Sequence, residues 1–234
     1  MNAGVDPYAG FAPIYDAWSA HMTEDVDFYV GLACEADGPI VELAVGTGRI
    51  AIPVAHAVGR SVIGIDTSPA MLAVARERAA RADAQLDLRE SDMRVLELDE
   101  PAALITCPGR SLLHLATWAD RRLVFERVTA SLRPGGRFAW NAFVFDPKIA
   151  AEHGGRWGEE GGVRRRVDYV PADNRLTVTL ESGDSVALWW VGRSEWEALI
   201  DVSGLELEAL YGWFDCRPFD DESREFVWVA RRPT

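Results

Sequence analysis

The stretch that decides the fold is VELAVGTGRI, residues 41–50. A short apolar run leads into two glycines, Gly46-Thr47-Gly48, and a helical pattern begins directly after them. Glycines at such a point let the backbone turn tightly and approach a ligand, while N–H groups of the following helix face it. The stretch therefore predicts a buried strand, a ligand-binding turn and a helix.

An acidic residue follows this turn at an informative spacing. Asp66 ends the next apolar run, SVIGID (61–66), and 66 − 46 is 20 residues after the first glycine. A carboxylate at this distance is typical of a site that receives ribose hydroxyls. A purely structural interpretation stays open, in which the glycines form a tight turn and Asp66 caps a helix.

Working outward, apolar runs alternate with helical stretches. The expected strands are 39–45, 61–66, 86–93, 102–107 and 137–145, and the expected helices are 49–58, 69–81 and 119–132. A helix at 194–202 and two more strands, 207–215 and 225–232, close the chain. This order predicts an α/β fold with a Rossmann-like, doubly wound, mostly parallel sheet of seven strands. Ligands bind such sheets at the edge formed by the strand carboxyl ends.

Two segments lie outside that alternation. Residues 1–38 are expected to form a helical cap, because apolar residues recur at helical spacing over 8–35. Residues 163–192 hold three alternating stretches joined by turn residues, which predicts an antiparallel three-stranded insert that acts as a lid. The aromatic residues of the insert suit either a roof over the site or a subunit interface, so a homodimer stays open. The chain, 1–234, is expected to be a single domain.

Composition excludes several classes of partner. The net charge of −13 argues against nucleic acid and an anionic membrane surface, which both need basic residues. The three cysteines have no metal-ligand spacing, so no metal site is expected and the thiols indicate a reducing compartment. The first residues lack the pattern of a signal peptide, and no apolar run reaches the ~18 residues that span a bilayer. A cytoplasmic protein with a small-molecule substrate is expected.

Two cofactors fit the glycine turn. NAD(P) is an alternative because residues 46–51 also match G-x-G-x-x-A. Three features favour a methyl donor instead: Glu42 lies four residues before Gly46, Asp92 closes the third strand in ESDM, and LRPGGR (132–137) joins a helix to the fifth strand.

The segments VELAVGTGRIAIPVA, GIDTSPAMLAVARERA, ESDMR and LRPGGRF resemble the successive motifs of the class I S-adenosylmethionine-dependent methyltransferases. The resemblance spans about residues 39–234 and is nearest to members that act on small molecules. It implies that S-adenosylmethionine is the cofactor and that it contacts Tyr15, Glu42, Ala44, Gly46, Gly48, Asp66, Thr67, Met71, Asp92, Met93 and Cys107. Ala44 departs from the family, which usually has glycine there.

Within that resemblance, Asp66 binds the ribose, Asp92 accepts from the adenine amino group, and Met71 and Met93 flank the adenine. The resemblance also places Tyr15 over the sulfonium end of the cofactor. For Tyr15 and for both methionines, packing in the core is the alternative role.

The acceptor side is less defined. His114 follows the fourth strand and is either a general base or a structural histidine, and Arg110 either orients an acidic substrate group or pairs with Asp120. Trp189 and Trp190 are adjacent on a strand and face opposite sides, so one is expected to pack and the other to cover the pocket. The expected reaction is in-line methyl transfer to nitrogen or oxygen of a small molecule. An NAD(P)-dependent oxidoreductase and a non-catalytic S-adenosylmethionine-binding regulator are the alternatives.

Overall fold

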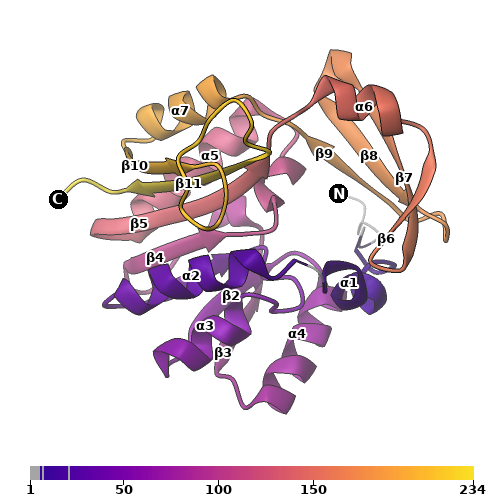
Figure 1. The fold of residues 1–234 in the computed structure, drawn as a ribbon. Helices are drawn as coiled ribbons and strands as arrows, with labels where there is room; N and C mark the ends of the chain where they lie inside the picture. Colours follow the sequence, from indigo (N-terminus) through magenta and orange to yellow (C-terminus); the bar gives the residue numbers. More distant parts are fainter. Residues whose placement is uncertain (1–5, 7, 21) are drawn as a thin grey trace.

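The computed structural model describes residues 6, 8–20 and 22–234, and its main sheet has the strand order β10-β11-β5-β4-β1-β2-β3 (Figure 1). The strands are β1 (Ile40–Leu43), β2 (Val62–Asp66), β3 (Leu86–Glu90), β4 (Ala102–Cys107), β5 (Leu132–Phe143), β10 (Glu206–Tyr211) and β11 (Glu225–Arg231). Strands β1 to β5 are parallel, whereas β11 runs antiparallel to both β5 and β10. The predicted mostly parallel, seven-stranded sheet is confirmed.

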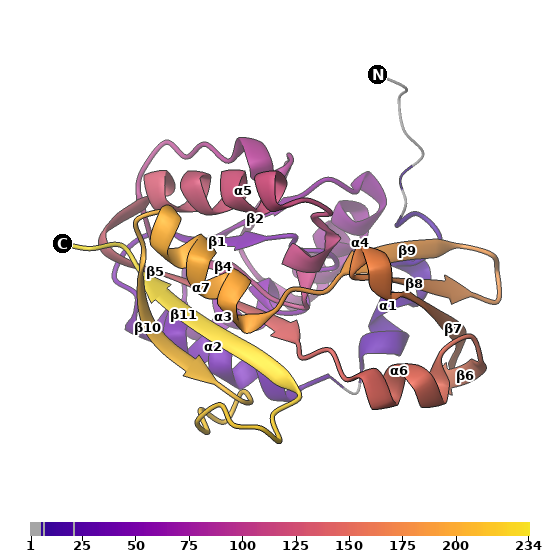
Figure 2. The same cartoon turned by 90° about the horizontal axis from the view of Figure 1, so that it is seen from above.

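Helices cover both faces of this sheet. One face carries α5 (Trp118–Ser131) and α7 (Arg193–Val202), and the other carries α2 (Glu24–Glu35), α3 (Ala51–Val58) and α4 (Pro69–Ala82) (Figures 1 and 2). The start of α4 agrees with the sequence, since the Ser68 hydroxyl accepts a 3.1 Å hydrogen bond from the Met71 N–H and Pro69 is the first helical residue.

Successive side chains of β5 and β11 point to opposite faces of the main sheet, so these strands contribute to the apolar core on both faces. Phe138 and Trp140 face α5 and α7, and Trp140 stacks on Trp228 of β11 with ring centroids 5.8 Å apart. Ala139 and Val227 face the α2 and α3 side. Because both faces are buried, the central strands are almost continuously apolar and form a rigid base for the loops at their carboxyl ends.

The insert forms a second sheet, with strand order β6-β7-β8-β9, that stands beside the main sheet at those carboxyl ends (Figure 1). Its strands are β6 (Trp157–Glu160), β7 (Val163–Val170), β8 (Arg175–Leu180) and β9 (Ser185–Trp189), and α6 (Pro147–His153) leads into it. The three strands predicted within residues 163–192 are confirmed as β7, β8 and β9, and the structure adds a fourth strand, β6, before them. Gly161 and Gly162, with φ of 58° and 75°, form a two-residue hairpin turn that returns β6 onto β7.

The N-terminal stretch consists of two helices. Residues 8–35 were predicted as amphipathic helical material, and they form the two helices α1 (Ala12–Ser19) and α2 (Glu24–Glu35). The first turn of α2 contains Glu24, Asp25 and Asp27. Acidic side chains stabilise the start of a helix because they interact with the partial positive charge of the helix dipole at its N-terminus. In the described part of the chain, no helix has the length and apolarity needed to cross a membrane.

Candidate functional site

The glycine turn lies where β1 meets the sheet edge and has the conformation that its sequence predicts. Gly46 and Gly48 have φ of 54° and 77°. Ala44, which stands where the resembled family has glycine, also has a positive φ of 54°. A left-handed alanine costs about 1–2 kcal/mol, so this turn is held in place by its surroundings.

Asp66 provides part of that constraint. One carboxylate oxygen accepts a 2.8 Å hydrogen bond from the Gly46 N–H, and the other accepts a 2.8 Å bond from the Ser68 N–H. Burial raises the pKa of Asp66, and its hydrogen bonds to backbone N–H groups offset only part of the rise. The side chain thus joins the glycine turn to the start of α4 at the edge of a large cavity.

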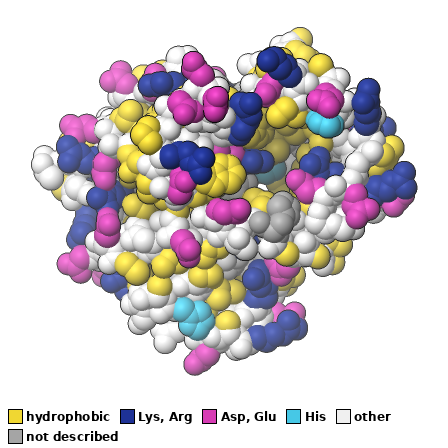
Figure 3. All heavy atoms as spheres, viewed as in Figure 1, with side chains coloured by type: hydrophobic (Ala, Val, Ile, Leu, Met, Phe, Trp, Pro, Cys, Tyr) yellow, Lys and Arg dark blue, Asp and Glu magenta, His cyan; other side chains and the backbone are white. Residues whose placement is uncertain are grey.

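The cavity measures about 980 Å³ and lies between the carboxyl edge of the main sheet, α1 and the insert. A hollow with apolar side chains exposed inside it opens beside the insert (Figure 3). Its wall includes eight of the eleven predicted cofactor residues: Tyr15, Ala44, Gly46, Asp66, Thr67, Met71, Asp92 and Met93. The contacts of these residues with a cofactor stay a prediction, but the fold brings them to one surface.

Three predicted cofactor residues lie off this wall. Glu42 is buried in β1, and Cys107 is buried at the end of β4, where burial raises the pKa of its thiol. A Cβ on Gly48 would lie 3.2 Å from the Ile52 side chain, so its glycine serves the turn and the packing of α3.

Asp92 is already engaged at the start of the 3₁₀ helix η1 (Met93–Val95). It accepts a 2.8 Å hydrogen bond from the Arg94 N–H and pairs with the Arg94 guanidinium at 2.6 Å. Burial acts to raise the pKa of Asp92, but its bonds to Arg94 outweigh burial and the net shift is downward. Asp92 is therefore an ionised acceptor on the cavity wall.

An N-terminal cover, defined as residues 6 and 8–20, closes the cavity through side-chain bonds to distant elements. Asp6 accepts a 2.7 Å hydrogen bond from the Ser68 hydroxyl. Asp16 accepts from the Thr47 hydroxyl at 2.7 Å and pairs with Arg78 of α4 at 2.7 Å. The cover is thereby attached to both the glycine turn and α4.

His114, at the end of the 3₁₀ helix η2 (Ser111–His114), connects the cover to the insert. Its Nε2 lies 2.7 Å from the Tyr8 hydroxyl, and its Nδ1 lies 3.2 Å from the Ala187 carbonyl oxygen in β9. Burial lowers the pKa of His114 to about 4, so the ring is neutral near pH 7. It therefore donates to Ala187 and accepts from Tyr8, an arrangement that favours the structural interpretation of this histidine over a general base.

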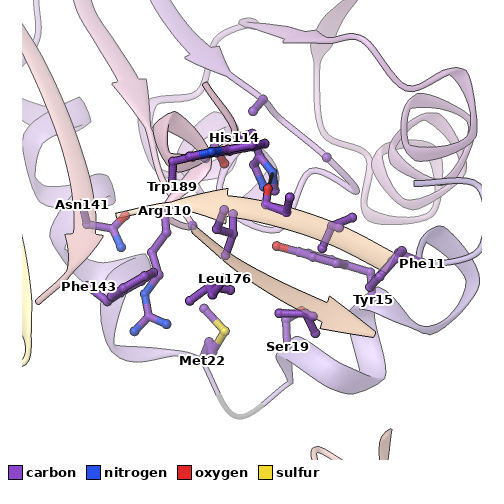
Figure 4. Close-up of a pocket in the computed structure, with 18 of the residues that line it drawn as sticks. Phe11, Tyr15, Ser19, Met22, Arg110, His114, Asn141, Phe143, Leu176 and Trp189 are labelled. Atoms are coloured by element: carbon purple, nitrogen blue, oxygen red, sulfur yellow. Dashed lines mark hydrogen bonds between the residues drawn. The ribbon is translucent and has the colours of Figure 1, made fainter. Parts of the chain in front are cut away.

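Arg110 points into the cavity but does not pair with Asp120, so that part of the prediction was wrong. Its guanidinium forms a bidentate pair with Glu225 of β11, with nitrogen–oxygen distances of 2.8 and 3.1 Å. The same group lies 5.7 Å from the centroid of the Phe143 ring (Figure 4). Asp120 pairs with Arg94 instead, at 2.9 Å. The backbone of Arg110 is in the αL conformation, with φ of 63°.

Sequence reasoning missed the polar groups behind Arg110. Asn141 donates to Glu225 at 2.7 Å and accepts from the Tyr29 hydroxyl at 3.0 Å. Glu225 is 1 % exposed and Asn141 is 2 % exposed, although both border the cavity. A lone polar residue inside the apolar run RFAWNAF was the available signal, because buried polar groups need partners.

The two adjacent tryptophans behave as alternation predicts. Trp190 is buried and stacks on Phe145 with ring centroids 3.9 Å apart, whereas Trp189 lines the cavity.

Known proteins resemble this chain in sequence. The model of the methyltransferase domain family matches residues 40–136. A demethylmenaquinone methyltransferase from Thermus thermophilus is 30% identical over 152 residues, which is 61% of this chain and 67% of that protein. The chain belongs to the class I S-adenosylmethionine-dependent methyltransferases. The NAD(P) alternative does not fit this family.

Two further comparisons concern the length of the match and the fold. The protein YqeM from Bacillus subtilis is 33% identical over 132 residues, which is 55% of this chain and 52% of that protein. The chain therefore spans about half of that relative's length. The solved CcbJ methyltransferase from Streptomyces caelestis superposes with a TM-score of 0.81 at 24% identity, over 98% of this chain and 99% of that one. This likeness shows that the fold, insert included, is a methyltransferase fold.

The residues present fit the cofactor of this methyltransferase family. Asp66 and Asp92 supply two acceptors on one wall, at the ends of adjacent strands. Glu42 is a buried carboxyl that receives no hydrogen bond from any residue described in the structure, next to the turn formed by Ala44 and Gly46. Such a group suits a ligand that brings a cation.

Proposed function

We propose that this protein transfers a methyl group from S-adenosylmethionine to a nitrogen or oxygen of a small-molecule acceptor. The observation that carries the proposal is the continuity of the cavity. Eight of the eleven predicted cofactor residues and a second, largely aromatic wall line the same 980 Å³ space. Ligand pockets of this size enclose drug-sized molecules, and a donor and an acceptor held together there react as one unit.

The cofactor, when bound, supplies an electrophilic methyl group on a sulfonium whose departure as a thioether needs no protonation. The protein therefore contributes binding, orientation and the exclusion of water. Asp66 binds the ribose and Tyr15 covers the reactive end. Arg110 is held by Glu225 and presents a fixed guanidinium to the acceptor. Because the charges of Arg110 and Glu225 cancel, this ion pair suits a hydroxyl or carbonyl oxygen of the acceptor better than a carboxylate.

A general base is needed only if the acceptor arrives protonated. Both ring nitrogens of His114 already have partners, so His114 holds Tyr8 and the insert in place rather than removing a proton. We propose that the insert is the roof of the acceptor site, because Trp189 and Tyr169 of the insert line the cavity. A homodimer through the insert is the competing arrangement, and light scattering distinguishes the two. We also propose a cytoplasmic location, since Cys34, Cys107 and Cys216 are all free thiols.

The test combines binding with turnover. Calorimetry should show micromolar binding of S-adenosylmethionine and of S-adenosylhomocysteine, and no binding of NADH. Incubation with S-adenosylmethionine and fractions of a metabolite extract should yield S-adenosylhomocysteine together with a product 14 Da heavier than its precursor. Binding without turnover in any fraction would favour the regulator, and NADH binding alone would overturn the proposal.

A further inference from the structure

The arginines that line the cavity are paired with acidic residues. Among the residues that the structure describes, four arginines form part of the wall. The nitrogen–oxygen distances are 2.6–2.8 Å in three of the pairs and 3.8 Å in the fourth, in the order Arg94–Asp92, Arg110–Glu225, Arg165–Glu160 and Arg224–Asp146. The side chain of Arg224 is 58% exposed, so water also solvates its charge. A ligand in the cavity therefore meets guanidinium groups whose charges are already balanced.

Acidic residues outnumber the arginines on the same wall. In the described part of the chain, the wall includes the four acidic partners and also Glu24, Asp25 and Asp66. Asp25 pairs with Arg49, which lies outside the wall. The net charge of the whole chain, −13, has the same sign. An anionic group that enters the cavity would therefore lose its hydration without gaining an unpaired cation, which is costly.

Glu225 is held in place on the side away from Arg110. Its side chain is 1 % exposed, and one of its oxygens accepts a 2.7 Å hydrogen bond from the Asn141 amide. The Asn141 oxygen in turn accepts a 3.0 Å bond from the Tyr29 hydroxyl. Because Tyr29, Asn141 and Glu225 are all buried, this row of hydrogen bonds keeps the carboxylate against Arg110 when a ligand binds.

Arg110 is the cation that this carboxylate neutralises. Its side chain is 42% exposed, lines the cavity and lies beside the Phe143 ring (Figure 4). Glu225 occupies the edge of the guanidinium formed by Nε and one Nη, an edge that a ligand carboxylate or phosphate would need for a bidentate pair. The other Nη can donate to an uncharged oxygen. Arg110 can thus orient an acceptor without attracting an anion.

The surroundings of this ion pair are aromatic. The same cavity is lined by Trp18, Phe143, Trp189 and Trp213. Aromatic walls bind apolar and planar molecules, and the faces of their rings also attract cations. An uncharged acceptor or an amine is therefore compatible with this wall.

We infer that Glu225 determines the charge class of the acceptor. By neutralising Arg110, it restricts the acceptor to an uncharged or amine-bearing molecule with an apolar body, and it excludes molecules that carry a phosphate, sulfonate or carboxylate group. Glu225 acts through Arg110 and is a specificity-determining residue, not a catalytic one. The inference rests on the proposed function, because it concerns the acceptor of the methyl transfer.

Two dyes of one skeleton measure this selectivity without any methyl transfer. 1-Anilinonaphthalene-8-sulfonate and N-phenyl-1-naphthylamine share the same rings, and only the first carries a sulfonate. Both become fluorescent in apolar cavities, so each is titrated into the protein saturated with S-adenosylhomocysteine. We expect the wild type to bind the uncharged dye about tenfold more tightly or better, since one uncompensated charge is worth at least that factor in a partly buried site.

The variants test the role of Glu225 directly. Glu225→Gln keeps the size of the side chain but leaves the charge of Arg110 unbalanced, so affinity for the sulfonate dye should increase by about tenfold while that for the uncharged dye changes little. Adding Arg110→Gln to Glu225→Gln removes the positive charge and should restore the preference of the wild type. Glu222→Gln removes an exposed acid near Glu225 in the sequence and should leave both affinities unchanged, which controls for the net charge of the chain.

Three results would overturn the inference: equal or tighter binding of the sulfonate dye by the wild type, no fluorescence increase with either dye, or an unchanged affinity for the sulfonate dye in folded Glu225→Gln. The comparison of dyes in the wild type decides the question even if Glu225→Gln does not fold.

Turnover separates this inference from the proposed function. A metabolite extract is divided on an anion exchanger at about pH 7.5, and formation of S-adenosylhomocysteine is measured with each fraction. Turnover with the unbound fraction agrees with both statements. Turnover confined to the retained, anionic fraction would contradict the inference while the proposed function stands, and absence of turnover with both fractions would count against the proposed function alone.

Discussion

Replacing Asp66 with alanine tests the donor side of the site most directly. The carboxylate accepts hydrogen bonds from the N–H groups of Gly46 and Ser68, and Asp66 lines the cavity. Bonds of neutral hydroxyls to a carboxylate contribute about 1.5–3 kcal/mol each, and the two ribose hydroxyls share one acceptor. We therefore expect Asp66→Ala to weaken binding of S-adenosylhomocysteine by about 2–4 kcal/mol, or about 30- to 900-fold.

The same substitution should change stability much less. Asp66→Ala removes two hydrogen bonds to N–H groups, but it also removes a partly buried carboxylate whose raised pKa shows that the folded state disfavours its charge. These effects oppose each other, so the free energy of unfolding in urea should change by about 1 kcal/mol or less. Asp87→Ala, at an exposed acid of the neighbouring strand, is the matched control and should bind normally. An unchanged dissociation constant in folded Asp66→Ala would show that Asp66 only shapes the turn.

Two further predictions concern the acceptor wall and the cover. Trp190→Ala should lower the free energy of unfolding by about 3–5 kcal/mol, because it removes a buried ring that stacks on Phe145. Trp189→Ala should keep the melting temperature and the affinity for S-adenosylhomocysteine of the wild type but lose acceptor turnover, because Trp189 lines the cavity. A change of mass in light scattering with intact turnover would instead show that the insert is a subunit interface. The pKa of His114 falls to about 4 in the folded protein from 6.5, so the stability that its neutral form contributes is complete above pH 6.5 and is lost as the pH falls toward 4. Melting temperatures from pH 4 to 7 should therefore decrease less steeply in His114→Gln than in the wild type, and parallel curves would contradict this.

The sheet was predictable from sequence because its signals are local and repeated. Apolar runs of strand length, the glycine turn at Gly46 and the Ser68-Pro69 helix start each specify their own geometry, and all agree with a parallel sheet. The wall containing Asp66 and Asp92 followed from the same reasoning, since parallel strands place their carboxyl ends on one edge.

The remaining features depend on contacts between residues distant in sequence. Whether Arg110 pairs with Asp120 or with Glu225 depends on the position of β11, which adjacent residues do not specify. The link from Tyr8 to His114 joins residues 106 positions apart, and the link from His114 to Ala187 of the insert joins residues 73 positions apart. The fourth insert strand was missed because Gly161 and Gly162 looked like loop composition rather than a hairpin turn.

The insert and the main sheet form separate hydrogen-bonded sheets, so a change in one need not disturb the strand pairing of the other. Substitutions on the inner face of β7, β8 or β9 can change the shape of the acceptor wall without altering the register of any strand that carries a donor residue. The shape of the acceptor wall can therefore change through substitutions in the insert alone, while the strands that precede Gly46, Thr67 and Asp92 keep their register.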